Sequence, residues 1–132
     1  MRKNEILNAF KNNKPVILWD PRKEKEADFV FPGEIITKKT LNFMLQKGRG
    51  LLCIAAKEED LVERGFFALP TNEKDMFHTN YYITIDYKDT KTGITAKERA
   101  KTISVFSEEG ESICGAFVDI DWIAWTTCPS EI

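Results

Sequence analysis

Short apolar runs, separated by polar or turn-forming residues, set the hydrophobic pattern of this chain. Runs of this kind, rich in β-branched and aromatic residues, predict strands. The segment 81–87 gives the clearest signal, because its polarity also alternates toward its end. The predicted strands cover residues 16–19, 29–31, 51–56 and 81–87, with one or two more in the apolar region 113–128.

Segments with the apolar spacing of helices lie between these strands. Thr37 suits the N-cap of the second helix, because its hydroxyl can accept a hydrogen bond from a free amide of the first turn. Gly48 suits the left-handed position after that helix. Thr95 and Glu98 fit a capping box, which predicts a helix start. The predicted helices cover residues 5–12, 38–46, 58–64 and 95–106.

The alternation of strands and short helices indicates the fold class. The chain has no repeat and no linker, so residues 1–132 are expected to form a single domain. One strand pair is expected to return like a hairpin, which favours a mixed sheet. We therefore predict an α+β fold in which helices pack on a mixed, twisted β-sheet.

Composition narrows the classes of function. The 132 residues are 42% apolar and 30% charged, with a net charge of -2, which provides no basic field for a nucleic acid. No run reaches the length of a membrane span, and residues 1–14 lack the apolar core of a signal peptide. Three widely spaced cysteines without a CxxC pair argue against a disulfide framework and a zinc site. We expect a reduced, cytoplasmic protein that binds neither nucleic acid nor membrane.

Three carboxylates alternate in the segment 23–28, shortly after the first predicted strand: Glu24, Glu26 and Asp28. In an extended backbone alternate side chains point to the same side, so all three acids can face one cavity. Such a cluster suits a hard divalent cation, which prefers oxygen ligands. It equally suits acid–base chemistry on a polar substrate. The alternative is a solvated acidic loop, whose charge the two neighbouring lysines balance.

Two further segments carry motifs. Residues 48–53 read Gly-Arg-Gly-Leu-Leu-Cys, and residues 92–99 read Thr-Gly-Ile-Thr-Ala-Lys-Glu-Arg after a strand-like run. With the acidic segment and the apolar run behind it, 18–32, they resemble the 3,4-dihydroxy-2-butanone 4-phosphate synthase family. That family has an Arg-Glu-x-Glu-x-Asp loop, a Gly-x-Gly-hydrophobic-hydrophobic-Cys motif and a Thr-Gly turn before an Asp-Arg helix start. Order and spacing agree over residues 5–106.

The resemblance implies a lyase of riboflavin biosynthesis. Members convert ribulose 5-phosphate to 3,4-dihydroxy-2-butanone 4-phosphate and formate, with Mg2+ or Mn2+ holding the sugar oxygens. By resemblance Glu24 binds the metal ion and the substrate, and Glu26 and Asp28 contact the sugar hydroxyls and move protons. Lys23 stands where the family has Arg, so it would contact the substrate as a point charge. Cys53 matches a cysteine at the edge of the catalytic site.

The resemblance also implies roles for the Thr-Gly turn. Thr92, Thr95 and Arg99 match residues beside the substrate, although Thr95 with Glu98 is equally explained as a helix cap. The family forms homodimers with active sites at the subunit interface. The implied partners are therefore a small-molecule sugar phosphate and a second copy of the chain.

Departures from the family leave the activity open. Its downstream Gly-His-Thr segment, with a metal-ligating His and a phosphate-binding Arg, has no counterpart, and His78, the only histidine, matches no functional one. Residues 107–132 form a divergent tail, in which we expect Trp122 and Trp125 to be buried. Besides a working synthase, the alternatives are a catalytically inactive, shortened homologue that binds a sugar phosphate or a partner, and a divergent enzyme for another small phosphate or polyol.

Overall fold

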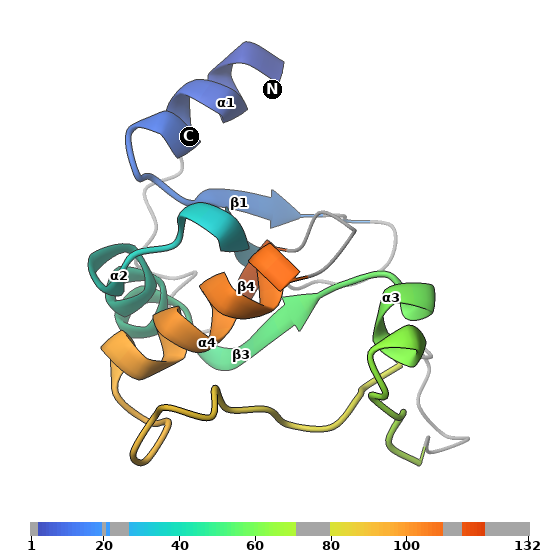
Figure 1. Ribbon diagram of the computed structural model, residues 1–132. Helices are drawn as coiled ribbons and strands as arrows, with labels where there is room; N and C mark the ends of the chain where they lie inside the picture. The colour runs from blue at the N-terminus through green and yellow to red at the C-terminus, as the bar shows by residue number, and fades with distance from the viewer. Residues whose placement is uncertain (1–2, 20, 22–26, 71–79, 110–114, 121–132) are drawn as a thin grey trace.

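The computed structural model describes residues 3–19, 21, 27–70, 80–109 and 115–120 (Figure 1). None of the helices in this described part has the length and apolar character needed to cross a bilayer. The elements are, in order, α1 (Lys3–Lys11), β1 (Val16–Trp19), β2 (Ala27–Pro32), the 3-10 helix η1 (Gly33–Ile35), α2 (Lys38–Gly48), β3 (Arg49–Ala55), α3 (Glu58–Glu63), α4 (Ala96–Glu109) and β4 (Gly115–Ile120).

The four strands form one sheet in the order β1-β2-β4-β3. The α+β class is confirmed, but every pairing among the described strands is antiparallel, so the predicted mixed sheet is wrong. Because β2 and β3 both run antiparallel to β4, they run parallel to each other, joined by the crossover through α2. The last strand separates them, and so this β–α–β unit contains no parallel pair.

β4 confirms one strand within the apolar region 113–128. The rest of that region, including Trp122 and Trp125, lies outside the described residues, and so does His78. The predicted burial of the two tryptophans therefore stays a prediction.

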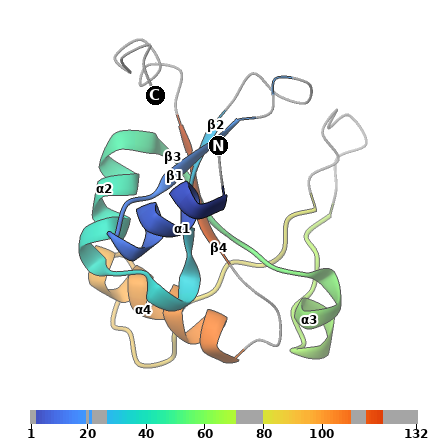
Figure 2. The ribbon, with the colours of Figure 1, turned by 90° about the horizontal axis from the view of Figure 1, so that it is seen from above.

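The hydrophobic core lies between one face of the sheet and the helices α2 and α4. Figure 1 and Figure 2 both show these two helices on the same side of the sheet. Helical and strand periodicity explain the pairing, because each places one apolar side of its element toward the other. The buried core side chains include Phe31 and Val118 of the sheet, Leu41 and Met44 of α2, and Ile103 of α4.

The start of α2 is as predicted, whereas its end is not. Thr37 Oγ1 accepts a hydrogen bond from the amide of Thr40 at 3.1 Å, which confirms the N-cap. The helix includes Gly48, and the left-handed residue is Arg49, with φ 67° and its N–H bonded to the Leu45 carbonyl. The prediction of Gly48 in that position is wrong because α2 runs two residues further than the spacing indicated.

The strand predicted over 81–87 is wrong. Within the described part this segment makes an isolated bridge between Ala68 and Tyr82 and runs outside the sheet, along the lower edge of Figure 1. The amide of Tyr87 donates to Thr102 Oγ1 of α4 at 3.0 Å. Aromatic and β-branched residues here pack beside a helix, and packing of this kind gives the same composition as a strand.

Candidate active site

Strand register identifies which face of the sheet each residue occupies. Directly paired residues of antiparallel strands share a face. Phe29 of β2 pairs with Val118 of β4, which pairs with Leu52 of β3. Because Val118 belongs to the core beneath α2 and α4, this row marks the covered face.

Asp28 and Cys53, two of the predicted site residues, lie on the opposite face. Each stands one position away from the covered row along its strand, and successive residues alternate between faces. Asp28 pairs with Asp119 and Cys53 with Phe117, two residues apart on β4. Standard strand spacing and rise put the Cα atoms of Asp28 and Cys53 about 12 Å apart. The structure therefore brings these two residues to one surface.

We call this surface the open face; its described side chains include Val16, Leu18, Asp28, Val30 and Cys53. All are exposed or intermediate in burial, and Leu18 is 60% exposed. The covered face, by contrast, contains the fully buried Val118. The open face is accordingly the side of the described sheet that a ligand or another chain can reach.

The acidic segment leads into the open face. β2 begins at Ala27, so of the three alternating acids Asp28 is the one that lies in the described part. Glu24, Glu26 and Lys23 lie outside the described residues. Among the residues that the structure describes, no group of three His, Cys, Asp or Glu side chains could hold a metal ion. A divalent cation at Asp28 would therefore need further oxygen ligands from outside the described residues.

The Thr-Gly turn is built around one carboxylate, that of Glu98. We call residues 91–95 the threonine turn. Glu98 Oε1 accepts from the amides of Lys91 at 2.8 Å and Thr92 at 3.4 Å. Glu98 Oε2 accepts from the hydroxyl of Thr92 at 3.2 Å and from the hydroxyl and amide of Thr95 at 3.0 and 3.3 Å. Five donors of the turn thus converge on one side chain.

These hydrogen bonds favour the ionised form of the Glu98 carboxyl group. The amide of Lys91, followed by the donors of Thr95 and Thr92, lowers the pKa of Glu98 from 4.5 to about 2, with desolvation acting in the opposite direction. Thr95 Oγ1 also accepts from the amide of Glu98 at 3.2 Å. The predicted capping box is confirmed, and its carboxylate is ionised at neutral pH.

Gly93 allows the turn to close. Its φ of 70° lies in the left-handed region that favours glycine. A Cβ atom there would overlap the carboxylate of Asp86, which lies directly against the glycine. Arg99, the last predicted residue of this region, lies half-buried in the first turn of α4, where its amide donates to the Thr95 carbonyl at 2.9 Å.

Asp28 lies at the start of β2 and the threonine turn lies at the start of α4, and these two elements approach each other at their other ends. β2 leads into η1, whose Gly33 abuts Ser107 in the last turns of α4. Asp28 is five residues, about 17 Å of strand, from that contact. Thr95 is twelve residues, about 18 Å of helix, from it, and the two elements run from it in different directions (Figure 2). Among the described residues, one chain therefore does not bring Asp28 and the threonine turn together.

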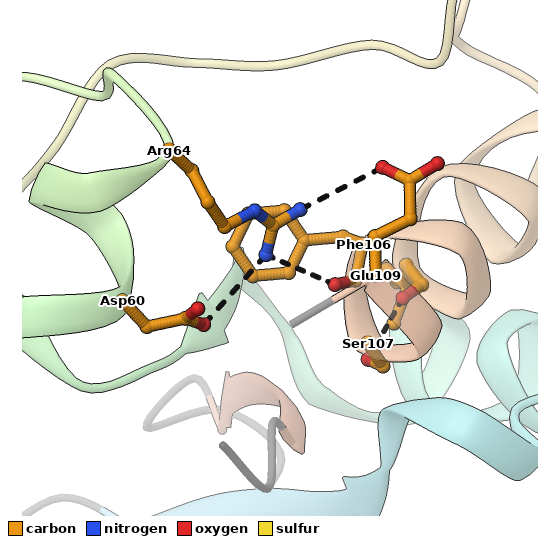
Figure 3. Close-up of polar contacts among 6 residues, drawn as sticks. Asp60, Arg64, Phe106, Ser107 and Glu109 are labelled. Carbon is orange, nitrogen blue, oxygen red and sulfur yellow. Dashed lines mark hydrogen bonds and ion pairs between the residues drawn. The ribbon is translucent and has the colours of Figure 1, made fainter. Parts of the chain in front are cut away.

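Arg64, which the sequence analysis did not single out, fastens α3 to α4 (Figure 3). Its Nη1 donates to the Phe106 carbonyl at 3.1 Å, and its Cζ lies 4.0 Å from the centroid of the Phe106 ring. Asp60 and Glu109 lie at 3.7 and 3.9 Å from the guanidinium. The cation therefore stabilises the end of a helix whose last carbonyls favour positive charge, and its partners balance its charge.

The sequence analysis also missed the full role of Glu98. The capping box explained its contacts with Thr95 and gave no reason to look further. The additional signal is the threonine three residues before Thr95, because Thr92 and the amide of Lys91 reach the same carboxylate.

Comparisons with known proteins agree with this fold. A family model described as 3,4-dihydroxy-2-butanone 4-phosphate synthase matches residues 4–118. The riboflavin biosynthesis protein RibBA of Thermotoga maritima is 45% identical over 104 residues, which is 79% of this chain and 26% of that protein. The 3,4-dihydroxy-2-butanone 4-phosphate synthase of Oceanobacillus iheyensis is 34% identical over 105 residues, 79% of this chain and 51% of that protein.

The chain thus spans about a quarter of the first relative and about half of the second. Among solved structures, a 3,4-dihydroxy-2-butanone 4-phosphate synthase in complex with two magnesium ions matches with a TM-score of 0.75 and 21% identity, covering 89% of this chain and 74% of that one. The two-domain synthase RibBX from A. baumannii matches with a TM-score of 0.74 and 20% identity, covering 91% and 48%.

At these identities the structural likeness shows the fold alone. The family itself is shown by the sequence match, which covers most of the chain and extends past residue 106, where the motifs end. The resemblance predicted from the three motif segments is therefore confirmed. The chain belongs to the 3,4-dihydroxy-2-butanone 4-phosphate synthase family.

Proposed function

We propose that this chain acts in riboflavin biosynthesis as a lyase that converts ribulose 5-phosphate to 3,4-dihydroxy-2-butanone 4-phosphate and formate. The observation that carries the proposal is the family match over residues 4–118. The placement of Asp28, the last acid of the acidic segment, on one accessible face with Cys53 supports it. The family's magnesium-bound member supports a divalent cation as cofactor.

The donor set of the acidic segment suits Mg2+ or Mn2+, because carboxylate oxygens are the ligands that hard cations prefer. Glu24 would hold the ion, which supplies Lewis-acid stabilisation of negative charge on the sugar oxygens. Glu26 and Asp28 would orient the sugar hydroxyls and move protons, with Lys23 contacting the substrate by its ammonium group. Cys53, about 12 Å from Asp28 by strand geometry, would border the site.

The active unit in this proposal is a homodimer with composite sites. Asp28 and the threonine turn lie away from each other in one chain, so the turn of one subunit would complete the open face of its partner. Ile94, at the tip of the turn, is 67% exposed, which is consistent with cover by a second subunit. Thr92, Thr95 and Arg99 would then reach the substrate across the interface.

The second candidate is a catalytically inactive homologue that binds a sugar phosphate or a partner. Its support within the matched part of the chain is Lys23, which stands where the family has Arg and would lose the bidentate contacts of a guanidinium. A cytoplasmic location is part of both proposals, because three widely spaced cysteines without a CxxC pair suit a reducing compartment.

Formate release decides between the two candidates. The chain is incubated with ribulose 5-phosphate and Mg2+, and formate is measured. We expect formate from the wild type, strong loss in Glu24→Ala and Asp28→Asn, and no loss in Glu63→Ala, an exposed acid of α3. Absence of formate with saturable, Mg2+-dependent thermal stabilisation by the sugar phosphate would favour the binding protein. Absence of both effects would exclude the lyase and the sugar-phosphate binder, and a stable complex with another chain would then support the partner-binding homologue.

Mixed variants test the composite site. Glu24→Ala and Thr92→Val are each expected to inactivate, since one alters the acidic segment and the other the turn. Mixed in equal amounts and allowed to exchange subunits, half of the dimers are heterodimers with one intact site each. About a quarter of wild-type activity should return, because a two-fold dimer pairs the two intact parts once. If both parts came from one chain, mixing would restore nothing.

A further inference from the structure

Glu98 contacts both threonines that the family resemblance assigns to the substrate. Its Oε1 accepts hydrogen bonds from the amides of Lys91 and Thr92. Its Oε2 accepts from both threonine hydroxyls, Thr92 at 3.2 Å and Thr95 at 3.0 Å, and from the Thr95 amide at 3.3 Å. The same carboxylate therefore holds the backbone of the turn and the hydroxyls of both threonines. A helix cap alone requires only the contacts with Thr95.

The hydrogen-bond capacity of each threonine follows from this arrangement. A hydroxyl has one proton and two acceptor lone pairs. Thr95 Oγ1 also accepts from the Glu98 amide at 3.2 Å, and Thr92 Oγ1 from the Ile94 amide at 3.4 Å. Each hydroxyl thus donates to Glu98, accepts one bond from the backbone and keeps one lone pair, which suits an O–H donor such as a sugar hydroxyl.

The charge of Glu98 makes this arrangement persistent. The turn donors hold the pKa of the carboxyl at about 2, so both oxygens remain acceptors across the neutral range. Gly93 and the adjacent Asp86 carboxylate fix the other side of the turn. The rotamers of both threonines are therefore set before any ligand arrives, which reduces the ordering cost of binding.

We propose that Glu98 is a positioning residue for the substrate, which it never touches, and that it acts by orienting the hydroxyls of Thr92 and Thr95 toward the hydroxyl groups of a sugar phosphate. The identity of the ligand rests on the proposed function. The orienting role itself rests on the five contacts of the ligand-free chain.

The first experiment uses the protein without ligand. Three-bond couplings measured by NMR report the χ1 rotamers of Thr92 and Thr95. We expect a single rotamer for each in the wild type and in Glu98→Asp, because a carboxylate remains and the family carries Asp at this position. Glu98→Gln keeps the size but lacks one acceptor oxygen, so we expect averaged rotamers. Thr37→Ala, which removes the comparable cap of α2, should leave both couplings unchanged.

The second experiment measures the Kd of ribulose 5-phosphate with Mg2+ by calorimetry for the same four proteins, with thermal unfolding confirming that each is folded. We expect Glu98→Gln to bind at least tenfold more weakly, and Glu98→Asp and Thr37→Ala to bind within twofold of the wild type. If Glu98 were only a structural cap, Glu98→Gln would bind the sugar phosphate within twofold of the wild type, as Thr37→Ala does.

The two experiments separate this inference from the proposed function. Fixed rotamers in Glu98→Gln, or averaged rotamers with unchanged affinity, would overturn the positioning role. If the wild type does not bind the sugar phosphate, the proposed function fails, and the couplings alone still decide whether Glu98 orients the two hydroxyls.

Discussion

Adding one methyl group at Gly33 tests how tightly η1 packs on α4. Gly33 and Ser107 are both buried. An alanine Cβ at Gly33 would overlap Ser107 Oγ and would lie 3.1 Å from Ser107 Cβ and 3.3 Å from Ile103 Cγ2. Overpacking of this kind costs about 2 kcal/mol. We expect Gly33→Ala to lower the urea midpoint of unfolding by roughly 1 M, given the usual urea dependence for a domain of this size.

Ser107→Ala is the second single variant of a double-mutant cycle with Gly33→Ala. Ser107 Oγ donates to the Ile103 carbonyl at 2.8 Å, a bond within one helix whose loss costs less than about 1 kcal/mol. Removing Oγ relieves the worst overlap with the methyl group added at Gly33 and leaves the 3.1 Å contact. The double variant should therefore recover about half of the loss, a coupling of about 1 kcal/mol. Circular dichroism during urea unfolding measures all four proteins; additive losses would refute the contact.

Three further predictions concern the two ends of α4. Folding lowers the pKa of Glu98 from 4.5 to about 2, so the contribution of its carboxylate to folding stability is present above pH 4.5 and is lost as the pH falls toward 2. The wild-type Tm should therefore fall more over that pH window than the Tm of Glu98→Gln. Parallel curves of Tm against pH would contradict this. Gly93→Ala should lower the Tm by several degrees, and more than Gly65→Ala, since both have positive φ but only the Cβ at 93 meets Asp86. Arg64→Met should destabilise the fold by about 2 kcal/mol in urea unfolding, through the lost bond to a helix-end carbonyl and the lost ring contact; a change within experimental error would show that α3 is not held by this cation.

Local signals in the sequence predicted the features that depend on neighbours in the chain. Thr37 and the box of Thr95 with Glu98 act on amides within a few residues, so the pattern alone determines the cap. The segment 81–87 was misassigned because membership of a sheet depends on a distant partner strand, and these residues pack beside α4 instead. The position of β4 between β2 and β3 is set by the same long-range pairing.

The candidate site was predictable in part. The motifs identified the family, and strand alternation is sufficient to put Asp28 and Cys53 on one face once the register is known. That the side chains of Glu24 and Glu26 face one cavity together with Asp28 stays a prediction, since Glu24 and Glu26 lie outside the described residues. The separation of Asp28 from the threonine turn was not predictable, because it follows from the contact between η1 and α4.

The anchoring of α4 makes the composite site testable by dilution. The contact of Gly33 with Ser107 and the bond from Arg64 to Phe106 both fix the last turns of the helix, so bringing its first turn to Asp28 of the same chain would break them. A second subunit can supply the turn without disturbing either contact. Specific activity should therefore fall as the proposed dimer dissociates, while circular dichroism at the same concentrations stays constant. A diluted protein of monomeric mass that keeps its full specific activity would refute the composite site and require α4 to move within one chain.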